Sequence, residues 1–384
     1  MKIVDVSVRV FRHTSNLMRD SDGHTHPGEP HPVRQALLTI TADDGSEGHC
    51  FSPVEVVRPH LVERFLKTVL IGQHPFHRER IWQDLAHWQR GSTSQLTDRT
   101  LAVAEMALWD MAGRKLGVPV YQLVGAYRDK VPAYGSTMCG DEIQGGLATP
   151  EDYGRYAEWL IGRGYKAIKL HTWMKPVSFA PSVDMDIKAC AAVREAVGPE
   201  VPLMLDAYHG YSRSEALRLG RGIQALGYTW YEEPMNEFSI SSYAWLAANL
   251  EIPVIGPETA DGKFHTRAEW IRAGACDILR TGVNDVGGIG PSLKIIHLAE
   301  AFGMDCEVHG GGAGNLVLCA AQRNGRWYER GLLHPHYDYD AVPEYLNRRS
   351  DEMDGDGFVH LSDQPGLGDD INFDYIDANL VSRS

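Results

Sequence analysis

Three acidic residues with equal spacing stand out in this chain. Asp206, Glu232 and Glu258 lie 26 positions apart, and each closes a short apolar run typical of a buried strand. Carboxylates at the ends of neighbouring parallel strands meet at one edge of a sheet, where they repel one another unless a cation joins them. Because no cysteine and histidine set has zinc spacing, these oxygen ligands favour Mg²⁺. A single acid could instead be a helix N-cap, but three in equal register favour a metal site.

Two basic residues lie on the run that precedes this series. Lys169 and His171 are two positions apart, so a strand places them on the same face. A neighbouring metal and lysine would tune the imidazole, which already titrates near neutral pH. The alternative interpretation is a surface lysine and a packed histidine.

Two further candidates close later apolar runs. His309 is followed by Gly310-Gly311-Gly312, which lets the backbone approach a ligand closely. From the opposite side of a barrel, this histidine could act on the other face of a substrate. Glu329 is a second candidate, although it could simply form an ion pair with Arg330.

Candidate substrate-binding residues lie in two polar segments. A loop predicted over residues 15–33 is rich in histidine and suits hydroxyls or a distal carboxylate, although a solvated loop without a role fits equally well. A second segment directly follows Asp206. The candidates are Arg19, His24, His26, Tyr208 and His209. His209 could act as an acid in place of His309.

The elements that position these residues follow a repeated β-α order. Short apolar runs predict strands over 132–139, 167–171, 203–206, 229–232, 253–258, 277–281, 305–309 and 327–330. Helical patterns, such as those over 150–163 and 292–301, lie between them. This order predicts an α/β fold with a parallel modified TIM (β/α) barrel.

The N-terminal region has a different pattern. Residues 2–12 and 36–42 alternate as antiparallel strands do, and helical patterns follow from Leu61. The segment 100–116 is apolar on nearly every face, which predicts a helix buried between domains. We therefore expect an N-terminal α+β capping domain over 1–128, a barrel over 129–350, and a C-terminal tail over 351–384 that packs back on the capping domain.

The composition of the chain limits the kinds of molecule that the protein could bind. The chain has 384 residues, with 37 Lys and Arg against 51 Asp and Glu, for a formal net charge of −14. The absence of a basic cluster argues against nucleic acid and anionic membranes. Six scattered cysteines favour a reducing cytoplasm. The start lacks an apolar signal core, and no run approaches the roughly 18 apolar residues of a membrane span.

Several motifs together carry a family resemblance. With these motifs the chain resembles the enolase superfamily and, within it, the mandelate racemase subgroup of acid-sugar dehydratases and racemases. The motifs are Asp206/Glu232/Glu258, the segments 107–113, 117–123, 286–289 and 365–368, and His309.

The resemblance implies roles for these residues. It implies Mg²⁺ on the three carboxylates and a first step that removes the proton α to a substrate carboxylate. Lys169 would then neutralise charge, and a protonated Glu329 would hydrogen-bond a carboxylate oxygen. The subgroup's tendency to assemble implies a homo-oligomer.

Two positions depart from the subgroup's pattern. His171 occupies a position where the subgroup often has a catalytic lysine, and Gly282 stands where an aspartate commonly partners the histidine at 309. Without that aspartate, His309 should be less basic and better suited to protonating a leaving hydroxyl. Asp285 could substitute for the missing aspartate. The base is therefore His171, Lys169 or His309.

The function expected from these features is that of a lyase. It would dehydrate a polyhydroxy sugar acid, aldonic or aldaric, through an enediolate to a 2-keto-3-deoxy acid. A racemase, epimerase or lactone cycloisomerase would use the same enediolate. A non-catalytic sugar-acid-binding protein is a third possibility, but the three metal-ligand candidates and Lys169 argue against it.

Overall fold

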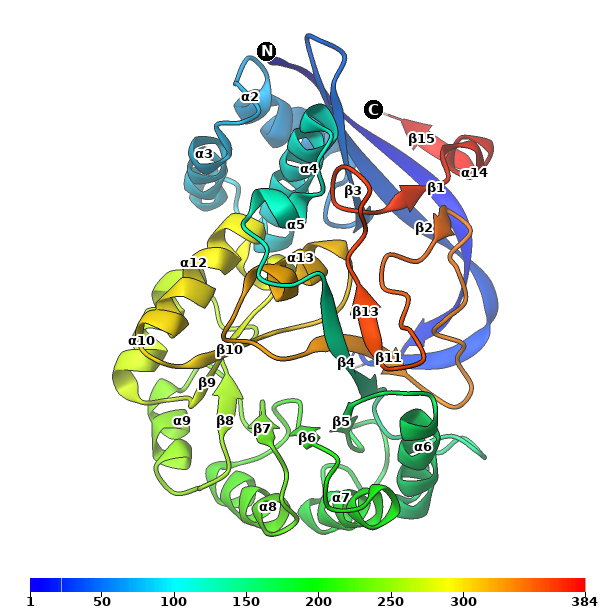
Figure 1. Ribbon diagram of the computed structural model, residues 1–384, viewed down its shortest axis with the longest axis vertical. Helices are drawn as coiled ribbons and strands as arrows, with labels where there is room; N and C mark the ends of the chain where they lie inside the picture. Colours follow the sequence, from blue (N-terminus) through cyan, green and yellow to red (C-terminus); the bar gives the residue numbers. More distant parts are fainter. Residues whose placement is uncertain (22, 384) are drawn as a thin grey trace.

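The computed structural model describes residues 1–21 and 23–383. Asp22, which falls in the loop predicted over 15–33, lies outside the described residues. An antiparallel sheet with its helices forms one half of the molecule, and a curled parallel sheet surrounded by helices forms the other (Figure 1).

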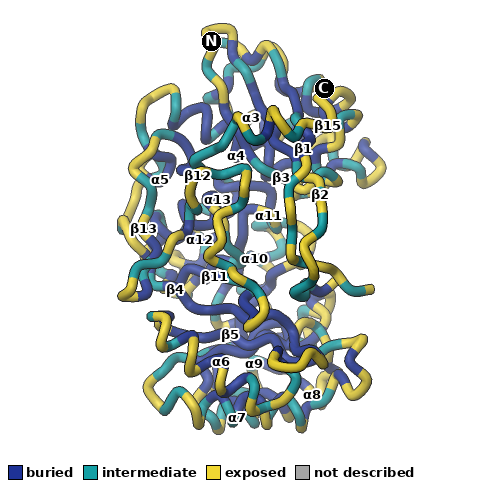
Figure 2. The backbone as a smooth tube through the Cα atoms, turned by 90° about the vertical axis from the view of Figure 1, so that its right-hand side faces the viewer, coloured by how far each residue is buried: buried dark blue, intermediate teal, exposed yellow. Residues whose placement is uncertain are grey.

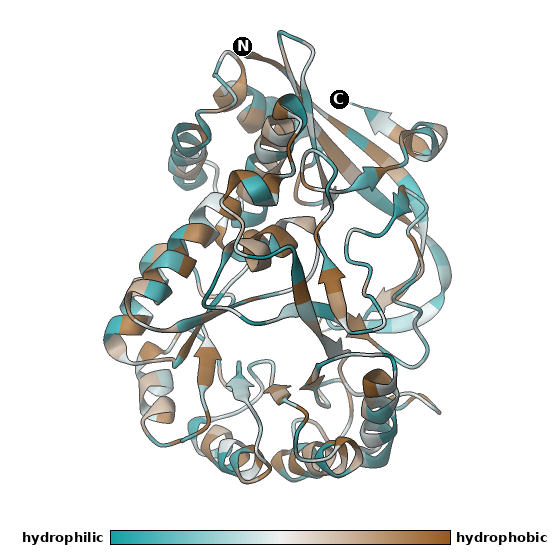
Figure 3. Ribbon diagram, in the orientation of Figure 1, coloured by the Kyte–Doolittle hydropathy of each residue, from teal (hydrophilic) through white to brown (hydrophobic). Residues whose placement is uncertain are grey.

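The parallel sheet confirms the predicted barrel strands. Its order is β10-β9-β8-β7-β6-β5-β4-β11, and each neighbouring pair is parallel. The eight strands are β4 (Lys130–Thr137), β5 (Ala167–His171), β6 (Leu203–Asp206), β7 (Trp230–Glu232), β8 (Val254–Gly256), β9 (Ile278–Thr281), β10 (Asp305–Val308) and β11 (Tyr328–Leu333). Strand β8 is coloured as hydrophobic whereas β7 is on the hydrophilic side of the scale, and the surrounding helices mix hydrophobic and hydrophilic residues (Figure 3).

Helices cover the outside of this sheet (Figure 1). They are α6 (Pro150–Gly162), α7 (Val183–Val197), α8 (Arg213–Ala225), α9 (Ile240–Ala247), α10 (Lys263–Ala273), α12 (Ile289–Ala301) and α13 (Ala313–Ala321). The short helix α11 (Val283–Val286) follows the end of β9 and contacts the N-terminal half of the molecule. The start of α6 shows how the sequence places them. Thr149 and Asp152 form a capping box there, and Pro150 occupies the first turn.

A contact from one side chain closes the barrel between β10 and β11. In the described residues these two strands share no ladder of hydrogen bonds. Instead, the carboxylate of Glu307 accepts hydrogen bonds from the backbone N–H groups of Arg326 (2.9 Å) and Trp327 (3.2 Å), just before β11. This contact holds β11, the eighth barrel strand, against β10, the seventh.

The N-terminal sheet corrects the predicted loop over 15–33. Its order is β15-β1-β2-β3, with β1 (Ile3–Arg19), β2 (Thr25–Ala42) and β3 (Glu47–Pro53). The first two strands pair as far as Arg19 and Thr25, so the loop prediction was wrong for most of its length. The first half of β2 contains prolines at 27, 30 and 32. They are tolerated because β2 pairs with β3 only from Gln35, which leaves its earlier half on a free edge.

One of the helices beside this sheet is buried on nearly all sides. They are α1 (Pro59–Leu61), the π-helical turn η1 (Val62–Leu66), α2 (Lys67–Leu70), α3 (Arg78–Gly91), α4 (Asp98–Leu116) and α5 (Val120–Leu123). Helix α4 contacts β3 as well as α11 and α12 of the barrel, which confirms the predicted buried helix (Figure 2). Thr97 caps its start, and Gly117 ends it in a left-handed conformation.

The C-terminal segment returns to both halves of the molecule. It contains β12 (Leu346–Arg348), β13 (Phe358–His360), β14 (Asp370–Ile371), α14 (Phe373–Ala378) and β15 (Leu380–Arg383). Strand β13 pairs with β4 of the barrel, and β15 pairs with β1. The predicted domain boundaries at 128 and 350 stay predictions.

In the described residues, no helix combines the length and the apolar character that a membrane crossing requires.

Candidate active site

The three equally spaced carboxylates meet at the end of the barrel strands. Asp206 and Glu232 end the paired strands β6 and β7, and Glu258 follows β8 by two residues. One ligand oxygen from each lies within 4.8 Å of the others, and all three side chains are buried. Burial and the charge of Glu232 raise the pKa of Glu258 well above its usual value, although His309 opposes this. Buried hard oxygen donors that resist joint ionisation fit a bound divalent cation.

The loop that carries Glu258 is held by two other buried residues. The carboxylate of Glu237 accepts hydrogen bonds from the backbone N–H groups of Glu258 (2.6 Å), Thr259 (2.8 Å) and Ala260 (3.0 Å). Arg267 donates to the carbonyl oxygens of Glu258 (2.6 Å) and Ala260 (2.5 Å). These contacts fix the third carboxylate although it lies beyond the end of its strand.

Two buried cations lie beneath the carboxylates. Lys169 Nζ is 3.1 Å from Glu232, 3.4 Å from Asp206 and 2.9 Å from Glu329. Arg280, on β9, lies 2.7 Å from Glu232 and 2.9 Å from Glu329. Sequence reasoning missed Arg280, but a charged residue inside an apolar strand was a signal, since a buried guanidinium requires acidic partners.

Glu329 differs from the expectation of a protonated acid. Burial raises its pKa, but Lys169 and Arg280 outweigh burial and hold the pKa of Glu329 well below its usual range. Its carboxylate also accepts a hydrogen bond from the backbone N–H of Gly310 (2.7 Å). These charges favour the ionised form of Glu329, and its role as a protonated acid toward a substrate stays a prediction. The alternative ion pair with Arg330 is absent in the described residues, because adjacent strand residues face opposite sides and Arg330 binds Asp340.

His171 faces the metal site from β5. Its Nδ1–H donates to the carbonyl oxygen of Thr137 (2.8 Å), which fixes the ring. Its Nε2 lies 3.0 Å from Asp206, its partner in the pairing of β5 with β6. The predicted common face of Lys169 and His171 is confirmed, since both contact Asp206.

His309 faces the same site from the far side, and it has an acidic partner. Its Nδ1 lies 2.8 Å from Asp285 and its Nε2 3.0 Å from Glu258. Burial lowers the pKa of His309, but the charges of Glu258 and Asp285 outweigh burial and raise it to about 10. The alternative that Asp285 substitutes for the missing aspartate is confirmed, and the expectation of a less basic His309 was wrong.

The position of Gly282 explains why the aspartate lies three residues later. A β-carbon at Gly282 would lie 2.9 Å from the carbonyl oxygen of His309 and would collide with the Asp285 carboxylate. A side chain at 282 is thus excluded by the backbone. The short helix α11 instead turns Asp285 back toward the imidazole.

The hairpin tip of β1 and β2 reaches the barrel. The ring of His24 contacts the ring of Tyr208 edge-on at 4.8 Å. Both His24 (3.2 Å) and His26 (2.9 Å) lie against the carboxylate of Asp20. The structure therefore brings two of the candidate residues together, whereas the side chain of Arg19 is exposed at the end of β1.

His209 is held by a different carboxylate. Its Nε2 lies 3.3 Å from Glu233, the residue after a metal-ligand candidate, and its Nδ1 lies 3.4 Å from the carbonyl oxygen of Met235. Tyr208 and His209 both have positive φ angles, 46° and 60°. Such conformations are uncommon for residues with a β-carbon and cluster at functional sites.

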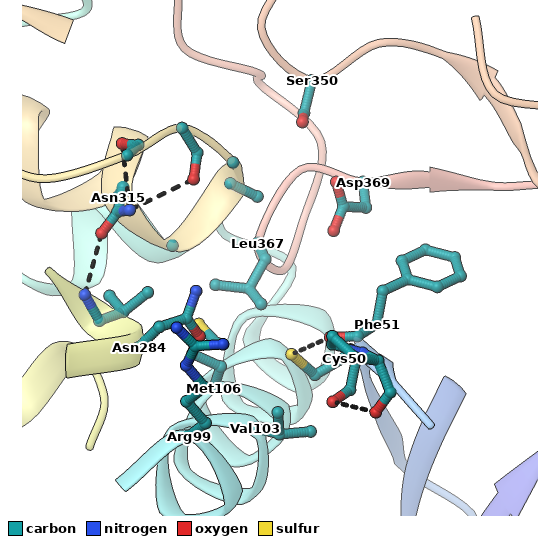
Figure 4. Close-up of a pocket in the computed structure, with 18 of the residues that line it drawn as sticks. Cys50, Phe51, Arg99, Val103, Met106, Asn284, Asn315, Ser350, Leu367 and Asp369 are labelled. Atoms are coloured by element: carbon teal, nitrogen blue, oxygen red, sulfur yellow. Dashed lines mark hydrogen bonds between the residues drawn. The ribbon is translucent and has the colours of Figure 1, made fainter. Parts of the chain in front are cut away.

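A cavity of about 430 Å³ opens beside His309 (Figure 4). It lies between β3 and α4 on one side and the segments after β9 and β10 on the other. The three metal-ligand candidates do not belong to its lining. His309 and Asp285 do, so this pair connects the cavity with the metal site.

Two family models match the chain. Residues 24–125 match the N-terminal domain of mandelate racemase and muconate lactonizing enzymes, and residues 152–375 match the enolase C-terminal domain-like family.

Individual relatives agree with this assignment. A D-glucarate dehydratase from Agrobacterium tumefaciens, solved in complex with magnesium, is 67% identical over 100% of both chains, with a TM-score of 0.98. A D-galactarolactone cycloisomerase from Agrobacterium fabrum is 30% identical over 97% of each chain. An L-talarate/galactarate dehydratase from Salmonella typhimurium is 31% identical over 91% of this chain and 84% of its own.

These findings confirm the resemblance, the modified barrel, Mg²⁺ as the cofactor and a hydro-lyase as the enzyme class. The chain belongs to the mandelate racemase/muconate lactonizing enzyme family of the enolase superfamily.

Proposed function

We propose that this protein is a Mg²⁺-dependent dehydratase of a polyhydroxy sugar acid, either aldonic or aldaric. It removes the proton α to the carboxylate and eliminates the β-hydroxyl, which yields a 2-keto-3-deoxy acid. The observation that carries this proposal is the placement of two histidines. His171 and His309 direct Nε2 at Asp206 and Glu258, two different carboxylates of one metal site.

Removal of the α-proton leaves a dianionic enediolate, which needs positive charge around it. Bound Mg²⁺ supplies Lewis-acid stabilisation of that charge. Lys169, which already lies against Glu232 and Glu329, adds a fixed cation at the substrate carboxylate. Arg280 holds the same carboxylates in place from below.

The partners of the two imidazoles suit different proton transfers. The Nδ1–H of His171 donates to the carbonyl oxygen of Thr137, so Nε2 is the nitrogen that can accept the α-proton. The carboxylate of Asp285 stabilises a protonated His309, which can deliver its Nε2 proton to the departing hydroxyl. His209 is the alternative acid, but its Nε2 faces Glu233 instead of a metal-ligand candidate.

The hairpin residues Arg19, His24 and His26, together with Tyr208, would contact substrate hydroxyls. The contact between His24 and Tyr208 supports this proposal, because it brings the hairpin to the residue that follows Asp206 by two positions. A small-molecule sugar acid is the partner that such a set of hydroxyl and imidazole groups suits.

A lactone cycloisomerase is the second candidate. The relative with this name matches 97% of the chain, and an α-proton transfer would use the same histidines and lysine. A non-catalytic binding protein is less well supported, since it would not need both histidines beside the metal carboxylates.

A panel of aldonic and aldaric acids tests the proposal. We expect the purified enzyme with Mg²⁺ to form 2-keto acids from at least one member, measured with a carbonyl reagent. Isomerisation or lactone opening without 2-keto acid would favour the second candidate. No conversion of any member would contradict the proposed function.

Deuterium exchange in heavy water tests the assignment of the two histidines. His309→Asn should block dehydration but leave some exchange of the α-proton, whereas His171→Asn should stop both. The reverse pattern would make His309 the base. Circular dichroism of both variants controls for folding.

A further inference from the structure

The tip of the β1-β2 hairpin brings together three side chains of the types that bind metal ions. Asp20 directly follows β1, His24 directly precedes β2, and His26 is the second residue of β2. Nδ1 of His24 lies 3.2 Å and Nε2 of His26 lies 2.9 Å from the same oxygen, Oδ2 of Asp20. One ligand atom from each residue lies within 4.8 Å of the other two, as in the carboxylate triad of the barrel. The tip is therefore a second place where potential metal ligands converge.

The backbone of the tip fixes this arrangement. The N–H of Asp20 donates to the carbonyl oxygen of His24 (3.1 Å), and the N–H of His24 donates to Oδ1 of Asp20 (3.0 Å). One carboxylate oxygen is thus held by the backbone, while the other faces both imidazoles. His24 is buried, and Asp20 and His26 are half-buried, so the ligand atoms are partly shielded from water. A cation would take the place of the protons between these atoms while the backbone stays as it is.

The set of donor atoms selects the kind of cation. Two imidazole nitrogens with one carboxylate oxygen suit Zn²⁺ and related transition-metal ions, whereas Mg²⁺ prefers oxygen ligands. Around a tetrahedral Zn²⁺ with bonds of roughly 2.1 Å, neighbouring ligand atoms lie about 3.4 Å apart. The contacts of 2.9 Å and 3.2 Å need only a small opening to reach this separation. The hairpin tip and the barrel carboxylates therefore suit different ions.

We propose that Asp20, His24 and His26 bind a Zn²⁺ ion at a second metal site, separate from the Mg²⁺ site of the barrel. Three protein ligands leave one tetrahedral position for water or another ligand. Metal bonds at Nδ1 of His24 and Nε2 of His26 fix the other nitrogen of each ring as an N–H donor, which remains for the substrate hydroxyls. The ion also holds the tip in the position where the ring of His24 contacts that of Tyr208 at 4.8 Å. This site does not depend on which reaction the barrel catalyses.

Calorimetric titration with Zn²⁺ tests the site in the whole chain, stripped of metal and then saturated with Mg²⁺. We expect one equivalent of Zn²⁺ to bind and excess Mg²⁺ not to displace it. Asp20→Asn should weaken this binding at least roughly a hundredfold, because a charged ligand is lost. Glu29→Gln, which removes an exposed acid from the same hairpin, should leave it unchanged. Absence of Zn²⁺ binding beside saturating Mg²⁺, or equal affinities of the two variants, would overturn the inference.

Glu232→Gln distinguishes the hairpin site from the barrel site, because it removes one of the three barrel carboxylates. Co²⁺ in place of Zn²⁺ gives a visible absorption that reports its ligands without turnover. This absorption should persist in Glu232→Gln and disappear in Asp20→Asn, with circular dichroism as the control for folding. Absorption that disappears in folded Glu232→Gln, or persists unchanged in Asp20→Asn, would place the ion at the barrel carboxylates and overturn the inference.

Discussion

Charge balance governs the active site at the scale of single residues. Four buried carboxylates surround two buried cations, so neither set is stable in the interior without the other. The carboxylates belong to Asp206, Glu232, Glu258 and Glu329, and the cations to Lys169 and Arg280. The excess of negative charge is what a divalent cation would neutralise.

Glu232 is the central member of this set, because it contacts both cations and pairs with Asp206 across the sheet. We expect Glu232→Gln to abolish activity and to weaken Mg²⁺ binding roughly a hundredfold or more, measured by calorimetry. Glu251→Gln, at an exposed site, is the matched control. Full turnover of Glu232→Gln after chelation and dialysis would rule out the metal role.

Asp285 orients His309 through a single hydrogen bond to Nδ1. We expect Asp285→Asn to lower kcat roughly a hundredfold while KM changes little, because the protonated imidazole loses its stabilising charge during proton transfer. Asp305→Asn, an exposed carboxylate of β10, is the control. A kcat for Asp285→Asn equal to that of the control would show that the contact has no catalytic role.

At the scale of elements, the long hairpin of β1 and β2 links the N-terminal sheet to the barrel. It carries His24 to the ring of Tyr208, and this contact depends on strand pairing that continues as far as Arg19 and Thr25. The hairpin can therefore influence which substrate fits without taking part in the chemistry of the barrel residues.

Alanine at Arg19, His24 or His26 tests this division. We expect each variant to change substrate preference or to raise KM roughly fivefold to tenfold, because a hydrogen bond to a hydroxyl is lost. Exchange of the α-proton in heavy water should survive, since enolisation needs only the barrel groups. Loss of exchange in all three folded variants would contradict the division.

The sheet itself contains a buried histidine that should make folding sensitive to acid. Burial, assisted by Arg114 and Arg9, lowers the pKa of His49 from 6.5 to about 3, and Glu47 at 3.8 Å does not offset it because that carboxylate is half exposed. The folded state thus binds this proton more weakly than the unfolded state. Its contribution to stability is complete above pH 6.5 and is lost as the pH falls toward 3.

Urea unfolding at pH 7.5 and pH 5 measures this effect. The unaltered protein should lose about 2 kcal/mol more of its free energy of unfolding than His49→Gln over this range. Glutamine does not titrate but can still bond to Thr39, which contacts His49 at 3.1 Å. Equal losses in both proteins would show that His49 does not titrate with folding.

At the scale of the whole molecule, helix α4 joins the two halves. The buried carboxylate of Glu105 accepts hydrogen bonds from the backbone N–H groups of Ile289 and Gly290, both at 2.9 Å, at the start of α12. Arg99, in the first turn of the same helix, lines the cavity beside His309. The position of this cavity wall therefore depends on the contact between Glu105 and α12.

We expect Glu105→Gln to lower the free energy of unfolding by about 1–3 kcal/mol, because one of the two backbone N–H groups then faces an amide donor. Denaturant unfolding measures this loss, and Glu158→Gln, at an exposed position of α6, serves as a control. A free energy of unfolding within about 0.5 kcal/mol of that of the unaltered protein would contradict a joining role.

The domain boundaries, the cytoplasmic location and the homo-oligomer stay predictions.

The sequence alone determined the barrel and its metal carboxylates. The apolar runs recur with β-α spacing, and parallel strands bring their ends to one mouth, so the convergence of Asp206, Glu232 and Glu258 followed from local pattern. The common face of Lys169 and His171 followed in the same way from the two-residue period of a strand.

Only the tertiary structure decided which partners these groups have. Arg280 and Glu329 lie 49 positions apart and meet across the barrel, and Lys169 together with Arg280 lowers the pKa of Glu329. Asp285 replaces the aspartate missing at Gly282 because the carbonyl of His309 blocks that position and α11 turns back. Partners and protonation depend on distances and burial between elements remote in sequence, and local pattern carries no information about those quantities.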